Sequence, residues 1–302
     1  MAEASSFFRA RDVAEQIGFK PRKQFGQNFV VDPNTIDRII RLANVTNEEV
    51  VLEVGPGLGA LTQALVKVAK AVLAVELDVQ LAARLPETLV ELASSSPNGL
   101  ESLTQNTPWR VLNRDALGMK SADFQFALSA GEIVQPNLVV ANLPYNIATP
   151  LVLHLFEVLP ELERMLVMVQ AEVAERWCAP AGGKTYGVPT VKLEWFAKCQ
   201  VVGHVDRSVF WPKPHVDSSL VELIKKPPPS TKASQEKVFR LIDSAFSQRR
   251  KTLVNSLTSR GYPREAVQAS LAAMELPEKV RGERLTCSQY VTLSDSLAAF
   301  AK

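Results

Sequence analysis

The chain has 302 residues, of which 46% are hydrophobic, so it is long enough to bury one large core or two smaller ones. Its 34 Lys and Arg residues nearly balance 32 Asp and Glu residues, so any attraction to a nucleic acid must come from local clusters of charge. Three cysteines far apart in the sequence (Cys178, Cys199 and Cys287) argue against a disulfide framework, and with three scattered histidines they argue against a metal site. The absence of a membrane-length apolar stretch and of a signal peptide predicts a cytoplasmic protein.

Three parts are predicted in chain order. Residues 1–30 form an N-terminal arm with a basic segment from Lys20 to Asn28. Residues 31–225 alternate between helical and strand patterns, as in a doubly wound α/β sheet. The three prolines of Pro227–Pro229 then form a stiff extended linker. Residues 233–302 form a small all-helical domain, because apolar residues from Val238 to Phe246 recur at helical spacing and Thr286 is suited to cap a last helix.

A glycine-rich turn follows the first predicted strand, Val50–Val54, and precedes a helix with Leu61 and Leu65 on its apolar face. In the turn, Gly55, Gly57 and Gly59 alternate with other residues, and glycines let a ligand approach the backbone closely. The spacing differs from the dinucleotide fingerprint and from the phosphate-binding loop. The turn therefore indicates a different nucleotide-like ligand, although a tight structural turn explains the glycines equally well when they are taken alone.

Two acidic residues follow the next two predicted strands. The strand at Ala71–Val75 ends in Glu76, where a carboxylate suits the hydroxyl groups of a ribose. The strand at Trp109–Leu112 is followed by Asp115, which can accept a hydrogen bond from an adenine amine. Ligands in open α/β sheets bind at the carboxyl ends of the strands, and these positions are therefore predicted to share one site. Simple solvation of a strand end is the alternative for each residue.

The most specific stretch is Asn142-Leu143-Pro144-Tyr145, directly after the apolar strand Leu138–Ala141. The Asn142 side-chain oxygen and the Leu143 carbonyl can accept hydrogen bonds from an exocyclic amine, which leaves the nitrogen lone pair free to attack an electrophile. Pro144 favours an extended backbone at Leu143, and Tyr145 offers a flat face on which a base can stack. These features predict methylation of a base amine, whereas an ordinary Asn-Pro turn is the alternative.

Taken together, the motifs resemble the S-adenosylmethionine-dependent ribosomal RNA adenine dimethyltransferases, from about Lys20 to the C-terminus. The residues that carry the resemblance are Gln27-Asn28-Phe29, Glu53–Gly59, Val75–Asp78, Asp115-Ala116, Asn142–Ile147, Phe210–Pro214, Val216–Ser218 and Ala245–Thr252. The resemblance implies an α/β fold, with a Rossmann-like S-adenosylmethionine-dependent methyltransferase sheet and a small C-terminal all-helical domain. One departure is Val30, where members of the family usually have leucine.

The resemblance also implies roles for individual residues. The catalytic residues are Asn142, Leu143, Pro144, Tyr145 and Phe210, with Phe210 expected to stack on the second face of the base. The methyl donor, S-adenosylmethionine, is expected to bind Asn28, Val30, Gly55, Gly57, Glu76, Asp115 and Asn142, with Asn28 closing over it from the arm, and no metal is needed. The phosphate contacts are expected at Arg22, Lys23, Arg249, Arg250 and Lys251, although such runs are often only a solvated helix face.

Three functional interpretations remain open. The first is dimethylation of two adjacent adenosines in the 3′-terminal hairpin of small-subunit rRNA, by a monomer that acts on immature small ribosomal subunits. The second is methylation of large-subunit rRNA, against which Leu143 and the segment from Gln248 to Thr252 argue. The third is a non-catalytic RNA-binding protein built on a methyltransferase fold, against which the intact Glu76, Asp115 and Asn142 argue.

Overall fold

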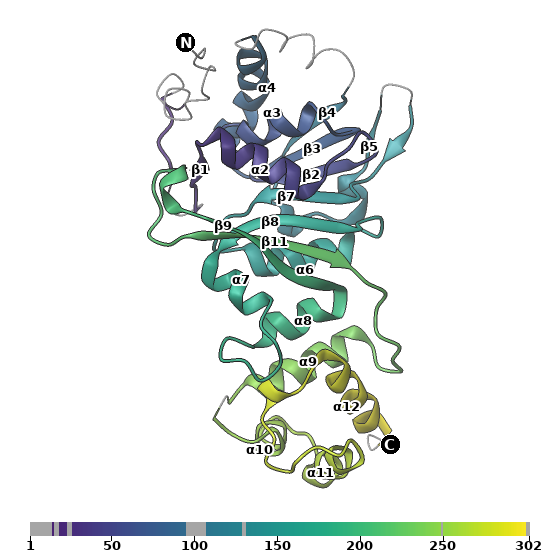
Figure 1. Ribbon diagram of the computed structural model, residues 1–302. Helices are drawn as coiled ribbons and strands as arrows, with labels where there is room; N and C mark the ends of the chain where they lie inside the picture. The colour runs from purple at the N-terminus through teal and green to yellow at the C-terminus, as the bar shows by residue number, and fades with distance from the viewer. Residues whose placement is uncertain are drawn as a thin grey trace. The chain divides into compact units, whose positions relative to one another are not determined.

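The computed structural model describes residue 14 and residues 18–22, 26–94, 107–128, 131–248 and 250–299. The chain forms two compact units (Figure 1). The first unit is made from residues up to 174 together with residues 200–224, and the second from residues 175–199 together with residues from 225 onward.

A seven-stranded sheet organises the first unit, in the order β4-β3-β2-β7-β8-β11-β9. Its strands are β2 (Val50–Val54), β3 (Ala71–Glu76), β4 (Trp109–Asn113), β7 (Leu138–Asn142), β8 (Arg164–Gln170), β9 (Ala197–Val205, which begins in the second unit) and β11 (Ser218–Lys225). The strands from β4 to β8 are parallel, and β11 runs antiparallel to β8. Strand order reverses between β2 and β7, which is where ligands bind in sheets of this kind.

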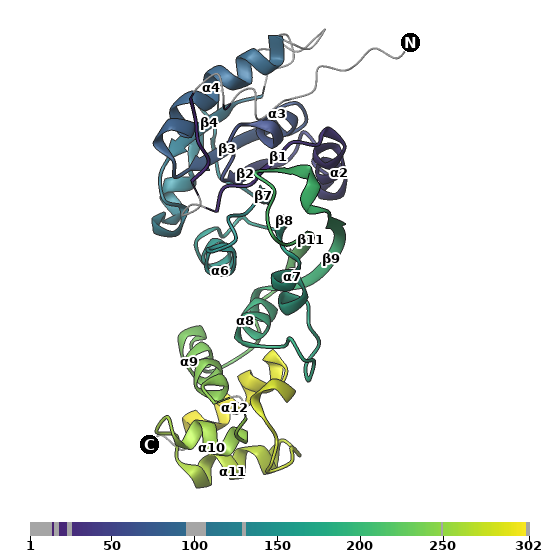
Figure 2. The same ribbon diagram turned by 90° about the vertical axis from the view of Figure 1, so that its left-hand side faces the viewer.

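Helices cover both faces of the sheet, and its central strands β2, β3, β7 and β8 are almost wholly buried. On one face, α2 (Pro33–Ala43) and α3 (Ala60–Val66) pack onto the sheet through an apolar core that includes Ile39, Leu65 and Val140, and α6 (Ala148–Val158) lies on the other face (Figures 1 and 2). Helix α4 (Val79–Ser94) packs on Ala74 through Leu85 and Leu89. Continuous apolar strands of this sort are typical of parallel sheets.

Short elements complete the first unit. Strand β1 (Phe29–Val30) pairs antiparallel with β10 (Phe210–Trp211), and β5 (Phe126–Ala127) pairs with β6 (Ile133–Val134). Short 3-10 helices span Ala116–Gly118, Ser121–Phe124 and Arg207–Val209. The four strands predicted from the sequence are thus confirmed, with bounds that differ by no more than one residue at either end.

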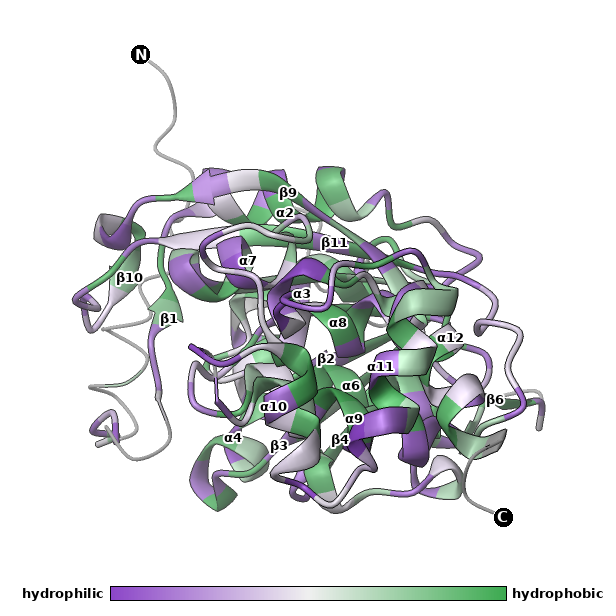
Figure 3. Cartoon of the chain, turned by 90° about the horizontal axis from the view of Figure 1, so that it is seen from below, coloured by the Kyte–Doolittle hydropathy of each residue, from purple (hydrophilic) through white to green (hydrophobic). Residues whose placement is uncertain are grey.

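The second unit is helical. It contains the end of α7 (Ala171–Trp177), together with α8 (Val188–Phe196), α9 (Gln235–Phe246), α10 (Leu253–Thr258), α11 (Arg264–Ala273), a 3-10 turn at Gly282–Arg284, and α12 (Cys287–Ala299). Both hydrophobic and hydrophilic residues occur along α10, as the green and purple segments in Figure 3 show. An aromatic cluster fills the interior: the Phe246 ring lies 6.4 Å from Tyr186 and 6.3 Å from Tyr290, measured between centroids.

The predicted helical features of the C-terminal region are confirmed. The apolar face of α9 is buried at Val238, Leu241, Ile242 and Ala245. The hydroxyl of Thr286 accepts a hydrogen bond of 3.3 Å from the backbone amide of Gln289, and the Gln289 side chain accepts one from the Thr286 amide. This reciprocal cap satisfies two amide groups at the start of α12 that the helix itself leaves unpaired.

One stretch lies in a different unit from that expected. The sequence prediction assigned residues 31–225 to one domain, but residues 175–199 group with the C-terminal helices. The cause is α8, whose Trp195 and Phe196 pack edge-on against Phe239 of α9 at centroid distances of 5.8 and 6.0 Å. Sequence periodicity describes each helix separately and does not report which neighbours it packs against.

Candidate functional site

A cavity opens at the carboxyl ends of the parallel strands, at the point where strand order reverses. Segments far apart in the sequence line it together: residues 26–30 of the arm, the turn after β2, the end of β3, residues 114–116 after β4, and residues 142–147 after β7. All of the residues predicted to bind the methyl donor line this cavity, namely Asn28, Val30, Gly55, Gly57, Glu76, Asp115 and Asn142. Among the described residues, no cluster of His, Cys, Asp or Glu side chains could hold a metal ion.

The glycine turn has a conformation that other residues rarely adopt. Gly55 and Gly57 have positive φ values of 74° and 57°, in the left-handed region. A Cβ atom added at Gly57 would lie 2.7 Å from the ring of Phe29, which is closer than real contacts allow. Glycine is therefore required at position 57 for two reasons: it allows the positive φ of the turn, and it leaves space for the Phe29 ring of the arm.

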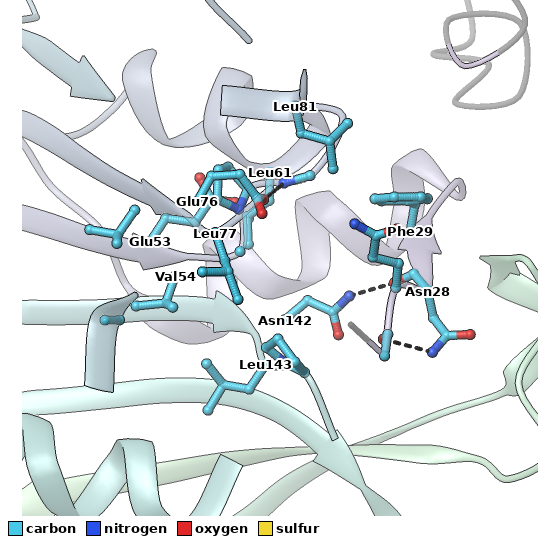
Figure 4. Close-up of a pocket in the computed structure, with 18 of the residues that line it drawn as sticks. Asn28, Phe29, Glu53, Val54, Leu61, Glu76, Leu77, Leu81, Asn142 and Leu143 are labelled. Carbon is cyan, nitrogen blue, oxygen red and sulfur yellow. Dashed lines mark hydrogen bonds between the residues drawn. The ribbon is translucent and has the colours of Figure 1, made fainter. Parts of the chain in front are cut away.

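Glu76 is held in place at the end of β3. Its carboxylate oxygens accept hydrogen bonds from the backbone amides of Gly57 at 3.1 Å and Asp78 at 2.9 Å. Figure 4 shows Glu76 among the residues that line the cavity. The side chain is buried, and burial raises the pKa of the carboxyl above its usual value. Two fixed amide donors orient the carboxylate and leave further lone pairs for the hydroxyl groups of a ligand.

Asp115 lies just after β4, the neighbour of β3 in the sheet, and is exposed. Its side chain accepts a hydrogen bond of 3.0 Å from the Leu117 amide and thereby starts the 3-10 helix at Ala116–Gly118. The pair Glu76 and Asp115 thus offers two acceptors at neighbouring strand ends, as the sequence predicts.

Glu53 is a site residue that the sequence prediction missed. It lies within β2, lines the cavity, and is only 2% exposed. Its Oε2 atom has no hydrogen-bond partner among the described residues, and burial raises the pKa of this carboxyl to about 8, with Glu76 acting in the same direction. A charged residue inside an otherwise apolar strand was the signal that could have found it.

The buried Glu53 carboxyl, one oxygen of which has no hydrogen-bond partner among the described residues, is a test of the expected ligand. S-adenosylmethionine carries a positive sulfonium group and an ammonium group, and either would stabilise the ionised form of Glu53. The cavity therefore fits this cofactor in charge, and Glu76 and Asp115 line the same cavity.

The N-terminal arm is fastened to the cavity by two kinds of contact. Phe29 packs in an apolar cluster with Phe19, Leu58 and Leu81, and its ring stacks on Trp211 at 6.1 Å between centroids. Polar contacts add to this cluster, since Arg22 forms an ion pair with Asp78 at 3.6 Å and Gln27 donates a hydrogen bond to the same carboxylate. The arm thus forms one wall of the cavity.

Asn142 faces the arm at the end of β7. Its side-chain nitrogen donates a hydrogen bond of 2.8 Å to the Asn28 carbonyl, drawn as a dashed line in Figure 4. Because this bond occupies the NH₂ end of the amide, the oxygen end is the one left to accept a hydrogen bond from a ligand. The geometry agrees with the acceptor role predicted for Asn142.

The next three residues present backbone and a ring to the same cavity. The Leu143 side chain is 1% exposed, and its amide donates to Met168 of β8 at 3.1 Å, so its backbone is fixed. The hydroxyl of Tyr145 lies 2.9 Å from the hydroxyl of Ser218, which is fully buried on β11. This contact fixes the Tyr145 ring and gives Ser218 a supporting part that the sequence did not reveal.

Phe210 does not lie where the sequence predicts. Its side chain is only 4% exposed, belongs to the apolar core that contains Val30 and Ile36, and is not among the residues that line the cavity. The pairing of β10 with β1 places Phe210 opposite Val30 and accounts for its burial. In this structure Phe210 packs beneath the arm segment at Val30, inside the apolar core, and its ring is not exposed in the cavity for stacking on a base.

The residues predicted to contact RNA have mixed outcomes. Arg22 lies beside Asp78, which neutralises part of its charge, whereas Arg250 and Lys251 are exposed. Lys23 and Arg249 lie outside the described residues. The C-terminal cations of this set were predicted to lie on a helix face, but α9 ends at Phe246, and Gln248, Arg250 and Lys251 lie outside any helix before α10 begins at Leu253.

Comparisons with known proteins agree with this geometry. Residues 18–299 match the family described as "Ribosomal RNA adenine dimethylase". The chain is similar to "Ribosomal RNA small subunit methyltransferase A" of Thermobifida fusca, with 45% identity over 94% of this chain and 93% of that protein. The protein of the same name from Rhodococcus erythropolis is 47% identical over 94% of this chain and 90% of that protein.

Two solved structures resemble most of the chain. A dimethyladenosine transferase from Plasmodium falciparum has a TM-score of 0.66 and 25% identity, covering 87% of this chain and 94% of that chain. The 23S rRNA methyltransferase ErmE has a TM-score of 0.62 and 27% identity, covering 89% and 99%. The chain therefore belongs to the ribosomal RNA adenine dimethylase family, and it is an S-adenosylmethionine-dependent methyltransferase.

Proposed function

We propose that this enzyme dimethylates the N6 amines of two adjacent adenosines in the 3′-terminal hairpin of small-subunit (16S) rRNA. The observation that carries the proposal is that Asn142, Leu143 and Tyr145 line one cavity, with the NH₂ group of Asn142 bound to the Asn28 carbonyl and the Tyr145 hydroxyl beside Ser218. Similarity to small-subunit methyltransferases at 45–47% identity supports the choice of substrate.

The residues act on the amine by orientation. An adenine amine is a weak nucleophile because its lone pair is delocalised into the ring. Hydrogen bonds from its N–H groups to Asn142 and to the Leu143 carbonyl hold the nitrogen, while stacking on Tyr145 fixes the plane of the base. S-adenosylmethionine supplies an electrophilic methyl group, and well-oriented reactants gain roughly 7–11 kcal/mol from proximity alone.

The cofactor is held by residues that meet at the strand ends. Glu76 binds its ribose, Asp115 its adenine amine, and the turn at Gly55 and Gly57 admits its methionine portion. The Glu53 carboxylate stabilises the positive charge of the cofactor. Asn28 and Val30 close the site from the arm, and no protein-bound metal takes part.

RNA binding requires a surface outside this cavity. The exposed Arg250 and Lys251, in the turn between α9 and α10, are proposed to contact phosphates, together with Lys23 and Arg249. Arg22 attracts phosphates less strongly than a free arginine would, because its ion pair with Asp78 neutralises part of its charge. In this proposal residues 1–30 are the closing arm, residues 31–225 the methyltransferase domain, and residues 233–302 the rRNA-binding domain.

The partner is proposed to be the immature small ribosomal subunit, bound by a monomer of this protein in the cytoplasm. Within the described residues, no helix has both the length and the apolar character needed to cross a membrane. Loop bases of a hairpin are already partly unstacked, so an enzyme of this kind presents them to its pocket at low cost.

The second candidate is methylation of large-subunit rRNA, which the similarity to ErmE supports. A methyl-transfer assay distinguishes these two candidate functions. The protein is incubated with labelled S-adenosylmethionine and, in separate reactions, immature small subunits, large subunits and each naked rRNA. We expect label in small-subunit rRNA alone, with two neighbouring dimethyladenosines after digestion. Label confined to large-subunit rRNA would select the second candidate, and no transfer to any of the substrates would support the non-catalytic interpretation.

A further inference from the structure

Two cysteines that are distant in the sequence lie side by side in the second unit. The Sγ atoms of Cys178 and Cys199 are 2.8 Å apart, and both residues are free thiols with part of their surface exposed. The sequence spacing argued against a disulfide framework and gave no sign that these two thiols lie together. The third cysteine, Cys287, is only 1% exposed.

The backbone on either side of the pair is anchored. Cys178 directly follows α7, and the Thr190 hydroxyl of α8 donates a hydrogen bond to the Arg176 carbonyl in the last turn of α7. Cys199 lies in β9, just after Phe196, whose carbonyl accepts a hydrogen bond of 2.8 Å from the Lys226 amide. Because both segments are fixed, the two sulfur atoms are held together by the fold.

A cavity of about 350 Å³ is lined by both cysteines. Lys198, Lys226 and Glu194 also line it. The cavity therefore gives a small oxidant access to the pair of cysteines.

The two thiols are not equivalent. The hydrogen bond from Cys199 lowers the pKa of Cys178, while the same bond and burial raise the pKa of Cys199. Cys178 is consequently the thiol that ionises first, and Cys199 remains protonated beside it. This is the arrangement of an attacking and a resolving cysteine.

We propose that Cys178 and Cys199 form a reversible dithiol–disulfide site, whose co-substrate is a small hydroperoxide such as hydrogen peroxide. The Cys178 thiolate attacks one peroxide oxygen, the O–O bond breaks, and Cys178 becomes a sulfenic acid as hydroxide leaves. The Cys199 sulfur then attacks the Cys178 sulfur and releases water. In sum, two thiols and one hydrogen peroxide give one disulfide and two waters, and a dithiol reductant reverses the change.

The disulfide would close a loop that runs from Ala179 to Lys198 and contains α8. Crosslinking two positions of a chain restricts its unfolded ensemble and stabilises the folded state. None of the residues around the pair lines the cavity that contains Asn142 and Glu76. The oxidised protein is therefore expected to unfold at a higher temperature and to keep its affinity for S-adenosylmethionine.

The test treats the full-length protein with hydrogen peroxide, blocks remaining thiols with N-ethylmaleimide, and maps them by mass spectrometry. We expect the wild-type protein to lose two hydrogens, to yield a peptide in which Cys178 is linked to Cys199, and to regain both thiols with dithiothreitol. Cys287→Ala should behave in the same way, while Cys199→Ser should stop at sulfenic or more oxidised forms of Cys178. Cys178→Ser should react much more slowly than Cys199→Ser.

Three results would overturn the proposal. The wild-type protein could keep all three thiols under conditions that oxidise free glutathione, or it could form disulfides only between separate molecules. The third contradicting result is equal reactivity of Cys178→Ser and Cys199→Ser towards hydrogen peroxide. The unfolding temperature of the oxidised wild-type protein, compared with the reduced form, provides a measurement that needs no substitution. An unchanged or lower temperature would contradict the predicted constraint.

Discussion

The side-chain nitrogen of Asn142 donates a hydrogen bond of 2.8 Å to the backbone carbonyl of Asn28, and this bond joins the end of β7 to the N-terminal arm. It also orients the amide, because its oxygen is the end left to accept a hydrogen bond. In the proposed function that oxygen accepts from the target amine, so one residue would connect the arm with orientation of the substrate.

Asn142→Ala should therefore have two effects of unequal size. Loss of an oriented hydrogen-bond partner of the reacting group typically lowers turnover by roughly 10²–10³-fold. Loss of the bond to Asn28 should weaken S-adenosylmethionine binding by no more than about tenfold, the equivalent of one ordinary hydrogen bond. Single-turnover methyl transfer and calorimetric titration measure the two quantities separately. Near-normal turnover in the variant would refute the role given to Asn142.

Gly57→Ala should impair cofactor binding through the arm. The new methyl group would meet the Phe29 ring at 2.7 Å, and the residue would keep an unfavourable positive φ of 57°. We expect at least a tenfold loss of S-adenosylmethionine affinity. Gly118→Ala is the matched control, because a Cβ there meets nothing within 4 Å and its φ is not positive. Equal affinities of the two variants would argue against this account of the turn.

The stability of the protein should carry a pH dependence that comes from Glu53. Its pKa is about 8 in the folded protein, against a usual value of 4.5, so the folded state binds the proton more tightly than the unfolded state does. The free energy of unfolding should then be highest below this window and fall as pH rises from 4.5 to about 8, by up to about 1.4 kcal/mol per pH unit.

Glu53→Gln removes the titrating proton while keeping the shape of the side chain. Urea unfolding of wild-type and variant protein across this pH range should show a steeper fall in the wild type, because the variant loses the contribution of Glu53 but keeps that of Glu76, whose pKa is also raised. Because positive charge on the cofactor favours the ionised carboxylate, S-adenosylmethionine binding near neutral pH should also release a proton from the wild type. Parallel stability curves, or binding heats that do not depend on the ionisation enthalpy of the buffer, would contradict this.

The basic turn between α9 and α10 tests RNA binding. Arg250 and Lys251 are exposed, and each phosphate contact removed should lower the slope of log K against log salt by about 0.9 on a duplex. Replacing both with Gln should weaken binding to immature small subunits and flatten its salt dependence, with cofactor binding unchanged. Arg260→Gln together with Lys279→Gln is a control of the same charge change on exposed residues of this unit. An unaltered salt slope would place the RNA surface elsewhere.

Much of the fold follows from local patterns. Strands such as Val50–Val54 and Leu138–Asn142 are apolar runs of the length expected in a parallel sheet, and glycine marks the turn that follows the first of them. Glu76, Asp115 and Asn142 share one cavity because carboxyl ends of parallel strands meet at one edge. These are consequences of sequence period and chain direction.

Other features depend on contacts that local patterns do not encode. Burial of Phe210 results from the pairing of β10 with β1, which joins residues far apart in the chain. The approach of Cys178 to Cys199 depends likewise on α8 and its neighbours. The end of α9 at Phe246 was missed because Gln248, Arg250 and Lys251 are good helix formers, although Thr252, which caps α10, was a signal for a new helix start.

The central claim is that the cavity around Asn142 transfers methyl groups from S-adenosylmethionine to adenosine amines of small-subunit rRNA. The most direct measurement is nucleoside mass spectrometry of that rRNA after reaction of immature small subunits with wild-type protein or Asn142→Ala. The account predicts dimethyladenosine at two adjacent positions of the 3′-terminal hairpin with the wild type, and none above background with the variant. It would be contradicted by wild-type protein that binds S-adenosylmethionine yet leaves those adenosines unmodified.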